Sequence, residues 1–322
     1  MSDRYARQSV LPEVGPTGQA RLASATALVV GAGGLGCAVL QYLAAAGVGR
    51  LVIVDHDLVE ESNLHRQPLY RMSDLGAPKV EAARAALLAT NPGVRIEAVR
   101  ERLTAANAAR LVGMAEIAVD AADSFAVTYV LSDACRGTPL VSASVLGLSG
   151  YVGAFCGGAP SYRAVFPELP RTAGSCAETG VLGTAVGVMG TLEAHMALAL
   201  LLKWEPTVLG RLISIDFRTL RTGGFSFAGA SEPAGATLRF IAPSEVSERD
   251  IVIDLRSPLE APRSPFGSAL RVGVEALEKG EMRFPTEPRI VLCCRTGVRA
   301  WRAARALERQ GHANLALIAL GE

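Results

Sequence analysis

A glycine-rich turn near the N-terminus could hold phosphate groups. Residues 31–36 read GAGGLG, directly after the apolar run TALVV at 26–30 and directly before an apolar stretch of helical length. Glycines at such a strand-to-helix turn let a phosphate approach the backbone N–H groups of the helix N-terminus. The candidate nucleotide-binding residues of the turn are Gly31, Gly33, Gly34 and Gly36.

A carboxylate ends the next apolar run. Asp55 closes LVIVD, nineteen residues beyond Gly36. A carboxylate at the end of the second strand can accept hydrogen bonds from ribose hydroxyls. The pattern predicts nucleotide binding without separating NAD from ATP, because both carry ribose and phosphate.

The polar loop that follows, DHDLVEESNLHRQPLY at 55–70, is rich in groups that bind anions. Asn63, Arg66 and Gln67 lie just beyond the nucleotide-binding strand, where Arg and Asn can clamp phosphates. Lys79 in GAPKVE is either a further point charge on the phosphates or a solvated surface lysine.

A second carboxylate, Asp123, stands in VDAADS at the end of the apolar stretch EIAVDAAD, residues 116–123. Open α/β sheets bind their ligands at the carboxyl ends of the strands. A carboxylate oxygen at that edge suits Mg²⁺, so we expect Asp123 to be the metal ligand.

The C-terminal part carries a different signal in CCRTGVRAW, residues 293–301, between an apolar strand and a basic amphipathic helix. Backbone N–H groups of a loop at a helix N-terminus can stabilise a thiolate or persulfide anion. Cys294, the first residue of this loop, is therefore a candidate for a thiolate or a persulfide. The loop residues are Cys294, Arg295, Thr296, Gly297, Val298 and Arg299.

Alternating strand and helix patterns position both groups of residues. In the first half, strands at 26–30, 51–55, 94–99 and 116–123 alternate with helices, which predicts a mainly parallel α/β sheet covered by helices. The stretch from Gly157 to Gly174 has loop composition. A smaller α/β pattern restarts after a linker-like segment, so we expect domains at 1–228 and 238–322, joined by a linker at 229–237.

Composition excludes several other classes of protein. The 322 residues carry a formal net charge of +1 and have no run of basic residues interleaved with aromatic ones, so no nucleic-acid partner is expected. The N-terminus lacks a signal peptide, which predicts a cytoplasmic protein. Glu193 and His195 interrupt the apolar stretch 181–202, which favours a buried helix over a membrane span. Six cysteines are too sparse for a disulfide scaffold.

Residues 4–220 resemble the adenylating enzymes that activate ubiquitin-like and sulfur-carrier proteins in molybdopterin, thiamine and tRNA-thiolation pathways. RYARQ, GAGGLG, the acid of IVDHD, SNLHRQ, GAPKVE and the aspartate of DAADS occur in that family's order and approximate spacing. The resemblance implies a Rossmann-like domain that uses ATP and Mg²⁺ to adenylate the C-terminal carboxylate of a protein ending in Gly-Gly, releasing pyrophosphate.

The resemblance also assigns roles to individual residues. Arg7 would be an arginine finger that reaches the neighbouring subunit's site, which implies a homodimer. Asp55 would hold ribose and Asp123 would position Mg²⁺. The phosphate contacts would come from Asn63, Arg66 and Lys79.

Two departures from the family pattern stand out. Members often hold zinc through two CxxC pairs, but the first expected place here reads PSYRAVF, with Ser161 and Ala164, and no second pair occurs at 222–236. We therefore expect no zinc site. Ser124 stands where the family usually has Asn, which would alter nucleotide contacts without abolishing them.

Cys176, in SCAETGVLG, matches a loop cysteine of the family that is proposed to link covalently to the carrier protein. It is either such a reactive thiol, in an acyl or a disulfide intermediate, or an unreactive loop thiol. Cys37, Cys135 and Cys156 are expected to be packing residues, with Cys37 and Cys135 on helices.

Residues 238–322 resemble a rhodanese-like domain, whose active loop reads CRxGxR. Asp254, Arg256 and Glu260 match an early structural motif of that family. Phosphatases of related fold use a longer CX5R loop, whereas only four residues separate Cys294 from Arg299, so sulfur is favoured over phosphate. The segment after Glu260 is shorter than usual, which leaves an inactive docking domain as an alternative.

Together these features predict an enzyme that adenylates a ubiquitin-like sulfur carrier and then converts its C-terminus to a thiocarboxylate. The sulfur would come through Cys294 from a cysteine desulfurase or thiosulfate. One rival is an activator of a ubiquitin-like modifier that conjugates through a thioester, with the second domain only docking. The others are a redox-sensing module that uses Cys293 and Cys294, and an NAD-dependent dehydrogenase.

Overall fold

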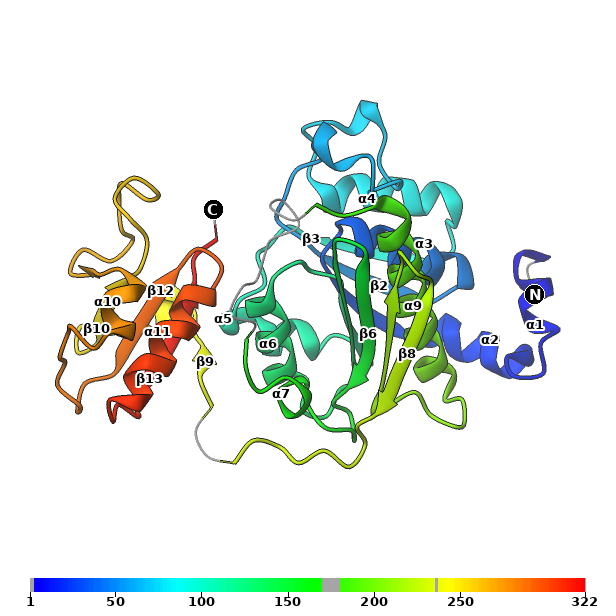
Figure 1. The fold of residues 1–322 in the computed structure, drawn as a ribbon. Helices are drawn as coiled ribbons and strands as arrows, with labels where there is room; N and C mark the ends of the chain where they lie inside the picture. Colours follow the sequence, from blue (N-terminus) through cyan, green and yellow to red (C-terminus); the bar gives the residue numbers. More distant parts are fainter. Residues whose placement is uncertain (1–2, 170–179, 235–236, 322) are drawn as a thin grey trace.

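Two β-sheets, each covered by helices, organise the chain (Figure 1). The computed structural model describes residues 3–169, 180–234 and 237–321. The first 226 residues build an eight-stranded sheet, and residues from 239 onward build a five-stranded sheet. The α/β class expected from the sequence is therefore confirmed.

The larger sheet has the order β3-β2-β1-β4-β5-β6-β7-β8. Its five strands from β3 to β5 are parallel, and β6, β7 and β8 are added antiparallel. The strands are β1 (Thr26–Val30), β2 (Arg50–Val54), β3 (Arg95–Val99), β4 (Ile117–Asp120), β5 (Leu140–Leu146), β6 (Ser149–Phe155), β7 (Arg211–Asp216) and β8 (Arg221–Ser226).

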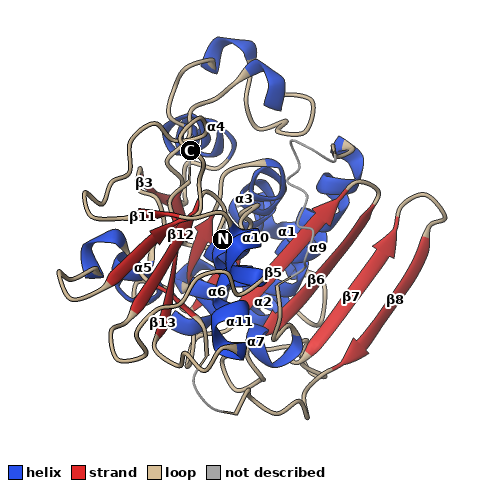
Figure 2. Cartoon of the chain, turned by 60° about the vertical axis from the view of Figure 1, so that its left-hand side comes forward, coloured by secondary structure: helices blue, strands red, loops and turns tan. Residues whose placement is uncertain are grey.

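The smaller sheet is wholly parallel, in the order β11-β10-β12-β13-β9. Its strands are β9 (Arg239–Phe240), β10 (Ile251–Asp254), β11 (Leu270–Arg271), β12 (Ile290–Cys294) and β13 (Leu315–Ala319). Figure 2 shows the strands of both sheets in red, with helices packed between and around them.

The helices follow the strands in alternation through most of the chain. In the larger part they are α1 (Ala6–Ser9), α2 (Gly15–Ser24), α3 (Gly34–Ala46), α4 (Lys79–Thr90), α5 (Ala105–Val112), α6 (Phe125–Ala134), α7 (Tyr162–Val165) and α9 (Gly183–Leu202). In the smaller part they are α10 (Val274–Glu278) and α11 (Val298–Arg309).

The central strands are apolar throughout because both faces of the sheet are covered. In β1, Ala27 and Val29 pack into the layer that holds α3 and α9, while Leu28 and Val30 pack into the layer of α5 and α6. This is the near-continuous apolar pattern that buried parallel strands require.

Among the described residues, one helix, α9, is long and apolar enough to span a membrane. However, 61% of its most apolar window is buried inside the protein, and it packs against α3 and the sheet. The expectation of a buried helix over residues 181–202 is confirmed, with the helix beginning at Gly183.

The two sheets share one apolar layer. The ring of Tyr129 on α6 lies 5.3 Å from that of Trp301 on α11 and 6.4 Å from that of Phe240 on β9. Glu168 accepts a hydrogen bond from Trp301 Nε1 at 3.1 Å and forms an ion pair with Arg305 at 2.6 Å. The smaller sheet is thus packed firmly against the helix layer of the larger one.

Several local expectations need correction. Strand β4 ends at Asp120, not at Asp123, because its last backbone bond runs from Ala121 N to Val30 O and the chain then turns into α6. Cys135 follows α6 as its C-cap residue and does not lie within the helix. The loop-like stretch from residue 157 contains the short helix α7, whose N-cap is Ser161.

Ser161 also joins the two segments where the resemblance would place metal-binding cysteines. Its backbone N–H and its Oγ donate to the carboxylate of Glu232 at 2.7 and 2.5 Å. A hydrogen-bonded pair therefore connects the two segments at that place.

Candidate functional site

A cavity of about 350 Å³ opens where the parallel strands of the larger sheet end. The turn after β1, the loops after β2, β3 and β4, and residues of β5 and β6 line it. This is the edge at which open α/β sheets bind ligands. The sequence-predicted residues that line it are Gly31, Gly33, Gly34, Asp55, Asn63, Arg66, Gln67, Lys79 and Asp123.

The glycine turn has a shape that only glycine permits. Gly31 has φ +97°, and a Cβ there would lie 2.6 Å from the carbonyl oxygen of Ala121. Gly36 is also required, since a Cβ would lie 2.0 Å from the carbonyl oxygen of Gly31. Gly33, in contrast, has open space around it. A Cβ on Gly33 would have only Gln67 Nε2 within 4 Å, at 3.7 Å. The turn is therefore tight against the protein and open toward the cavity, which fits a phosphate cradle.

Asp55 is fixed by its neighbours in the turn. Its Oδ2 accepts from the Ala32 N–H at 2.7 Å, and its Oδ1 accepts from the Asp57 N–H at 2.8 Å. The carboxylate is half-buried and lines the cavity. Each oxygen has a second lone pair with which it can accept a hydrogen bond from a ligand hydroxyl.

Lys79 is not a solvated surface lysine. It is 5% exposed at the first position of α4, and its Nζ lies 2.8 Å from Asp57 Oδ2. Partial burial alone would raise the pKa of the Asp57 carboxyl, but the hydrogen bond and charge of Lys79 outweigh it and lower that pKa. The pair places a fixed cation and an ionised carboxylate at the cavity wall.

The loop after β2 contributes a further cation and an unpartnered amide. Arg66 Nη2 donates to Asn63 Oδ1 at 2.5 Å, so the two predicted phosphate contacts support each other. Gln67 is 3% exposed, and its Oε1 has no hydrogen-bond partner within the described chain. A buried amide oxygen without a partner is costly, so a ligand donor at the cavity would satisfy it.

Two carboxyl groups lie at different depths at and just after the end of β4. Asp123 is exposed and lines the cavity. Asp120 is fully buried, and its Oδ2 accepts from Ser142 Oγ at 2.8 Å. Burial raises the pKa of Asp120 to about 6 and raises that of the buried Glu193 on α9 well above its ordinary value. Of these three groups, Asp123 is the one that is exposed and lines the cavity.

Arg102 and Tyr151 are among the polar residues of the cavity that sequence reasoning missed. Arg102 follows β3 and faces Asp57 and Asp123 closely enough for their charges to act on its pKa, which burial lowers. Tyr151 on β6 forms a 2.6 Å hydrogen bond with Tyr162. Arg102 could have been found by the same rule that located Asp123, because it lies just beyond the carboxyl end of a parallel strand.

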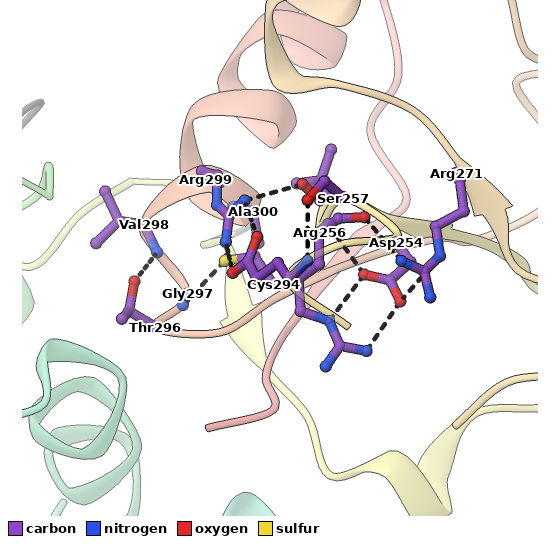
Figure 3. A network of polar contacts seen from close by, with 12 residues as sticks. Asp254, Arg256, Ser257, Arg271, Cys294, Thr296, Gly297, Val298, Arg299 and Ala300 are labelled. Atoms are coloured by element: carbon purple, nitrogen blue, oxygen red, sulfur yellow. Dashed lines mark hydrogen bonds and ion pairs between the residues drawn. The ribbon is translucent and has the colours of Figure 1, made fainter. Parts of the chain in front are cut away.

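The Cys294 loop forms a second polar site at the end of β12 (Figure 3). The N–H groups of Gly297 and Ala300 point at Cys294 Sγ, at 3.1 and 3.4 Å. Cys294 is 0% exposed. Burial raises the pKa of its thiol above the ordinary value, although the Ala300 and Gly297 N–H groups and the charge of Arg299 act in the opposite direction. The two N–H groups thus favour an anionic sulfur at this position, whereas its burial favours the neutral thiol.

A charged network anchors this loop. Arg299 forms an ion pair with Glu260 and donates to the Leu255 carbonyl at 3.1 Å. Arg256 binds both oxygens of the buried Asp254, at 3.0 and 2.9 Å. Figure 3 shows Arg299, Arg256 and Asp254 near Cys294. The acidic and basic residues singled out after β10 therefore hold the loop and its helix in place.

The remaining predicted residues lie elsewhere. Arg7 is exposed on α1 and is not among the residues that line the cavity. Cys176 lies outside the described residues. Cys37, Cys135 and Cys156 are buried, and burial raises their pKa values, to about 12 for Cys37 and about 11 for Cys156. These three have the surroundings expected of packing residues.

Comparison with known proteins agrees with this geometry. The sequence model of the ThiF family matches residues 5–234, which include the whole lining of the cavity. The chain belongs to the ThiF family.

Curated relatives in this family differ in how much of the chain they match. The SAMP-activating enzyme E1 of Haloferax volcanii is 44% identical over 218 residues, which are 66% of this chain and 81% of that protein. The adenylyltransferase and sulfurtransferase MOCS3 of Bos taurus is 47% identical over 228 residues, 68% of this chain but only 50% of its own length. A Mycobacterium tuberculosis protein named probable adenylyltransferase/sulfurtransferase MoeZ is 33% identical and covers 96% of this chain and 88% of its own.

A solved structure confirms the fold of the ThiF-type part. The crystal structure of E. coli MccB with MccA aligns with a TM-score of 0.64 over 74% of this chain and 74% of that one. At 22% identity this similarity concerns the fold alone. Because the MoeZ match covers 96% of this chain, it extends beyond the ThiF match into the part that contains Cys294.

Proposed function

We propose that the protein adenylates the C-terminal glycine of a small ubiquitin-like sulfur carrier with ATP and then delivers sulfur to it, forming a thiocarboxylate. The observation that supports this most directly is the pairing of two anion-binding sites in one chain. One is a nucleotide-sized cavity with fixed cations, and the other is a loop whose N–H groups surround a single sulfur.

In the adenylation half, the cavity residues align and neutralise the reactants. Asp55 would accept from the ribose hydroxyls, and the glycine turn with Asn63, Arg66 and Lys79 would hold the phosphates. A carboxylate that attacks an α-phosphate needs alignment and charge neutralisation more than a strong base. The unpartnered Gln67 Oε1 would accept a donor from the ligand.

Mg²⁺ would be held by Asp123, the exposed carboxylate at the cavity edge. Its oxygen is the donor type that Mg²⁺ prefers, and the ion usually keeps several waters and binds phosphate oxygens as well. When bound, it would neutralise charge on the polyphosphate.

The sulfur half rests on residues 238–322 as a rhodanese-like domain, joined through 229–237 to the adenylating domain at 1–228. Cys294 would take sulfur from a cysteine desulfurase or thiosulfate to form a persulfide. Its terminal sulfur would attack the acyl adenylate, displacing AMP and leaving an acyl disulfide on Cys294. Cys176 would then attack Cys294 Sγ, forming a disulfide and releasing the thiocarboxylate. An acyl intermediate on Cys176 is the alternative order.

The quaternary arrangement follows from Arg7. Since this arginine is exposed on α1 and does not line its own chain's cavity, its role as a finger requires a second copy, and we propose a homodimer. We place the enzyme in the cytoplasm, with the carrier and the sulfur donor as its partners.

ATP–pyrophosphate exchange with Gly-Gly-ended carriers tests the first half. Intact mass of the carrier after addition of thiosulfate or a desulfurase tests the second, where sulfur replacing oxygen adds about 16 Da. Exchange together with this gain is the expected result, and absence of exchange with every carrier would overturn the proposal.

The burial of Cys294 favours one alternative function, which should be tested together with the proposed one. With its thiol 0% exposed, the C-terminal part could serve only for docking, in an enzyme that activates a ubiquitin-like modifier through a thioester. Exchange accompanied by an isopeptide-linked product, with no mass gain on the free carrier, would support that alternative.

A further inference from the structure

One arginine connects the nucleotide cavity to the sulfur-bearing loop. Arg102 lines the cavity, and its Nη1 donates to the carbonyl oxygen of Leu320 at 3.1 Å. Leu320 directly follows β13, at the C-terminal end of the chain. Figure 1 shows this end on the side of the smaller part that faces the larger one.

The carbonyl that Arg102 holds is next to the Cys294 loop. The Leu320 N–H donates to the Cys294 carbonyl at 2.9 Å, and the Gly321 N–H donates to the Arg295 carbonyl at 2.8 Å. Gly321 has φ +72° and lies so close to the guanidinium that a Cβ on it would overlap Arg102 Nη1. The two residues that follow β13 therefore connect the arginine to the first two residues of the loop.

The other side of the loop lies against Phe240 on β9 of the smaller sheet and against α6 of the larger part. A Cβ on Gly297, which has φ +88°, would lie 2.6 Å from the Phe240 ring and 3.5 Å from Ala126 on α6. Ala126 is three residues beyond Asp123, so the same short segment borders both sites. With Arg102 on one side and α6 on the other, the docked arrangement leaves Cys294 0% exposed.

We propose that Arg102 is a positioning residue that holds the Cys294 loop closed against the adenylating part, and that the phosphates of bound ATP release it. This inference rests on the proposed function for the identity of the nucleotide. Arg102 donates to a neutral carbonyl in the docked state, whereas a phosphate oxygen forms a stronger, charge-assisted hydrogen bond with a guanidinium. Phosphates held by Lys79 and a cation held by Asp123 would lie near Arg102, which faces Asp123 and the Asp57 partner of Lys79.

The consequence is a link between the two sites. If ATP binds better when Arg102 is free of Leu320, then docking of the loop weakens ATP binding by a certain free energy. By linkage, bound ATP destabilises the docked loop by the same free energy. Cys294 would be shielded before ATP arrives and accessible to a sulfur donor once the cavity is filled.

The test measures alkylation of Cys294 by iodoacetamide, read by peptide mass spectrometry on the full chain at one fixed pH. In the wild type we expect slow alkylation without nucleotide and a rise of about fivefold or more with saturating Mg-ATP. Arg102→Gln should be fast in both conditions. Cys293, on the opposite face of the sheet, is the internal control and should stay slow throughout.

Gly321→Ala loosens the same contact from the other side without replacing a residue that lines the cavity. It should raise Cys294 alkylation in the absence of ATP, and it keeps the test valid if Arg102→Gln fails to fold. Arg84→Gln removes an exposed arginine on α4 and is the matched control that should behave as the wild type.

Equal Cys294 rates in the wild type and both variants would overturn the holding role. A wild-type rate that ignores ATP, while calorimetry on the same sample shows ATP bound, would overturn the release. Failure of the wild type to bind ATP would instead contradict the proposed function and the release with it, and the nucleotide-free comparison would still decide whether Arg102 holds the loop.

Discussion

The glycine turn and the Cys294 loop have the same local architecture but differ in what they face. Each joins a buried parallel strand to a helix through a glycine with positive φ, Gly31 at +97° and Gly297 at +88°. The first opens into a cavity of about 350 Å³, whereas the N–H groups of the second point at one sulfur of their own chain. The same strand–turn–helix unit thus faces an open cavity in one part of the chain and the sulfur of its own strand-end cysteine in the other.

The largest expected effect separates these two sites by chemistry. Cys294→Ser should abolish the mass gain on the carrier while leaving ATP–pyrophosphate exchange unchanged. Arg66→Ala should lower exchange by about 10²-fold or more, because a charge-stabilising group of the cavity is lost, while persulfide loading stays intact.

The controls for this comparison are Cys293→Ala and Arg84→Gln. Cys293 is the neighbouring buried cysteine on the other face of the sheet, and Arg84 is an exposed arginine outside the cavity. Loss of exchange in Cys294→Ser would mean that the two sites do not act separately, and unchanged exchange in Arg66→Ala would remove Arg66 from the site.

A smaller effect concerns the turns themselves. Gly31→Ala and Gly297→Ala each add strain at positive φ and a contact at 2.6 Å, so we expect each to lower the free energy of unfolding by about 2–4 kcal/mol. Gly76→Ala is the matched control, because Gly76 has φ +80° but open space around it, and should cost only about 1 kcal/mol. Urea unfolding measures the free energy of unfolding of all three variants. Equal losses in the three variants would show that the atoms near Gly31 and Gly297 move aside without cost.

An effect of comparable size, seen only when pH is changed, concerns the buried Asp120 carboxyl at the end of β4. Burial raises the pKa of the Asp120 carboxyl from 3.8 to about 6. The unfolded chain therefore loses this proton more readily than the folded protein, and the free energy of unfolding falls as pH rises through this range. Asp120→Asn keeps an acceptor for Ser142 and removes the ionisation. We expect the free energy of unfolding of the variant, relative to that of the wild type, to be about 3 kcal/mol higher above pH 7 than below pH 4.

Unfolding free energies of the wild type and Asp120→Asn at both pH values check this. Glu248→Gln, at an exposed carboxyl in the smaller part, controls for general pH effects. A difference between wild type and Asp120→Asn that does not change with pH would contradict the buried ionisation.

Local sequence patterns sufficed for most elements and many site residues. The apolar runs at β1 and β2 predicted their strands within one residue, because strands buried on both faces leave no room for polar residues. The glycine turn, Asp55 and Asp123 were located by the rule that ligands bind where parallel strands end. A helix was expected around Cys135 but without bounds, and β4 was extended to Asp123, because the apolar sequence continues where the hydrogen-bonded ladder stops.

What the sequence determined alone is therefore the chemistry present: a phosphate-binding turn, cations beyond the second strand, and a cysteine at the end of a strand. Tertiary structure decided which of these groups meet. Only the packing of α4 buries Lys79 against Asp57, and only the docking of the smaller sheet on α6 brings Leu320 to Arg102, 218 residues away in the chain. Residue patterns report local backbone and burial preferences, whereas contacts over such separations depend on how whole elements pack.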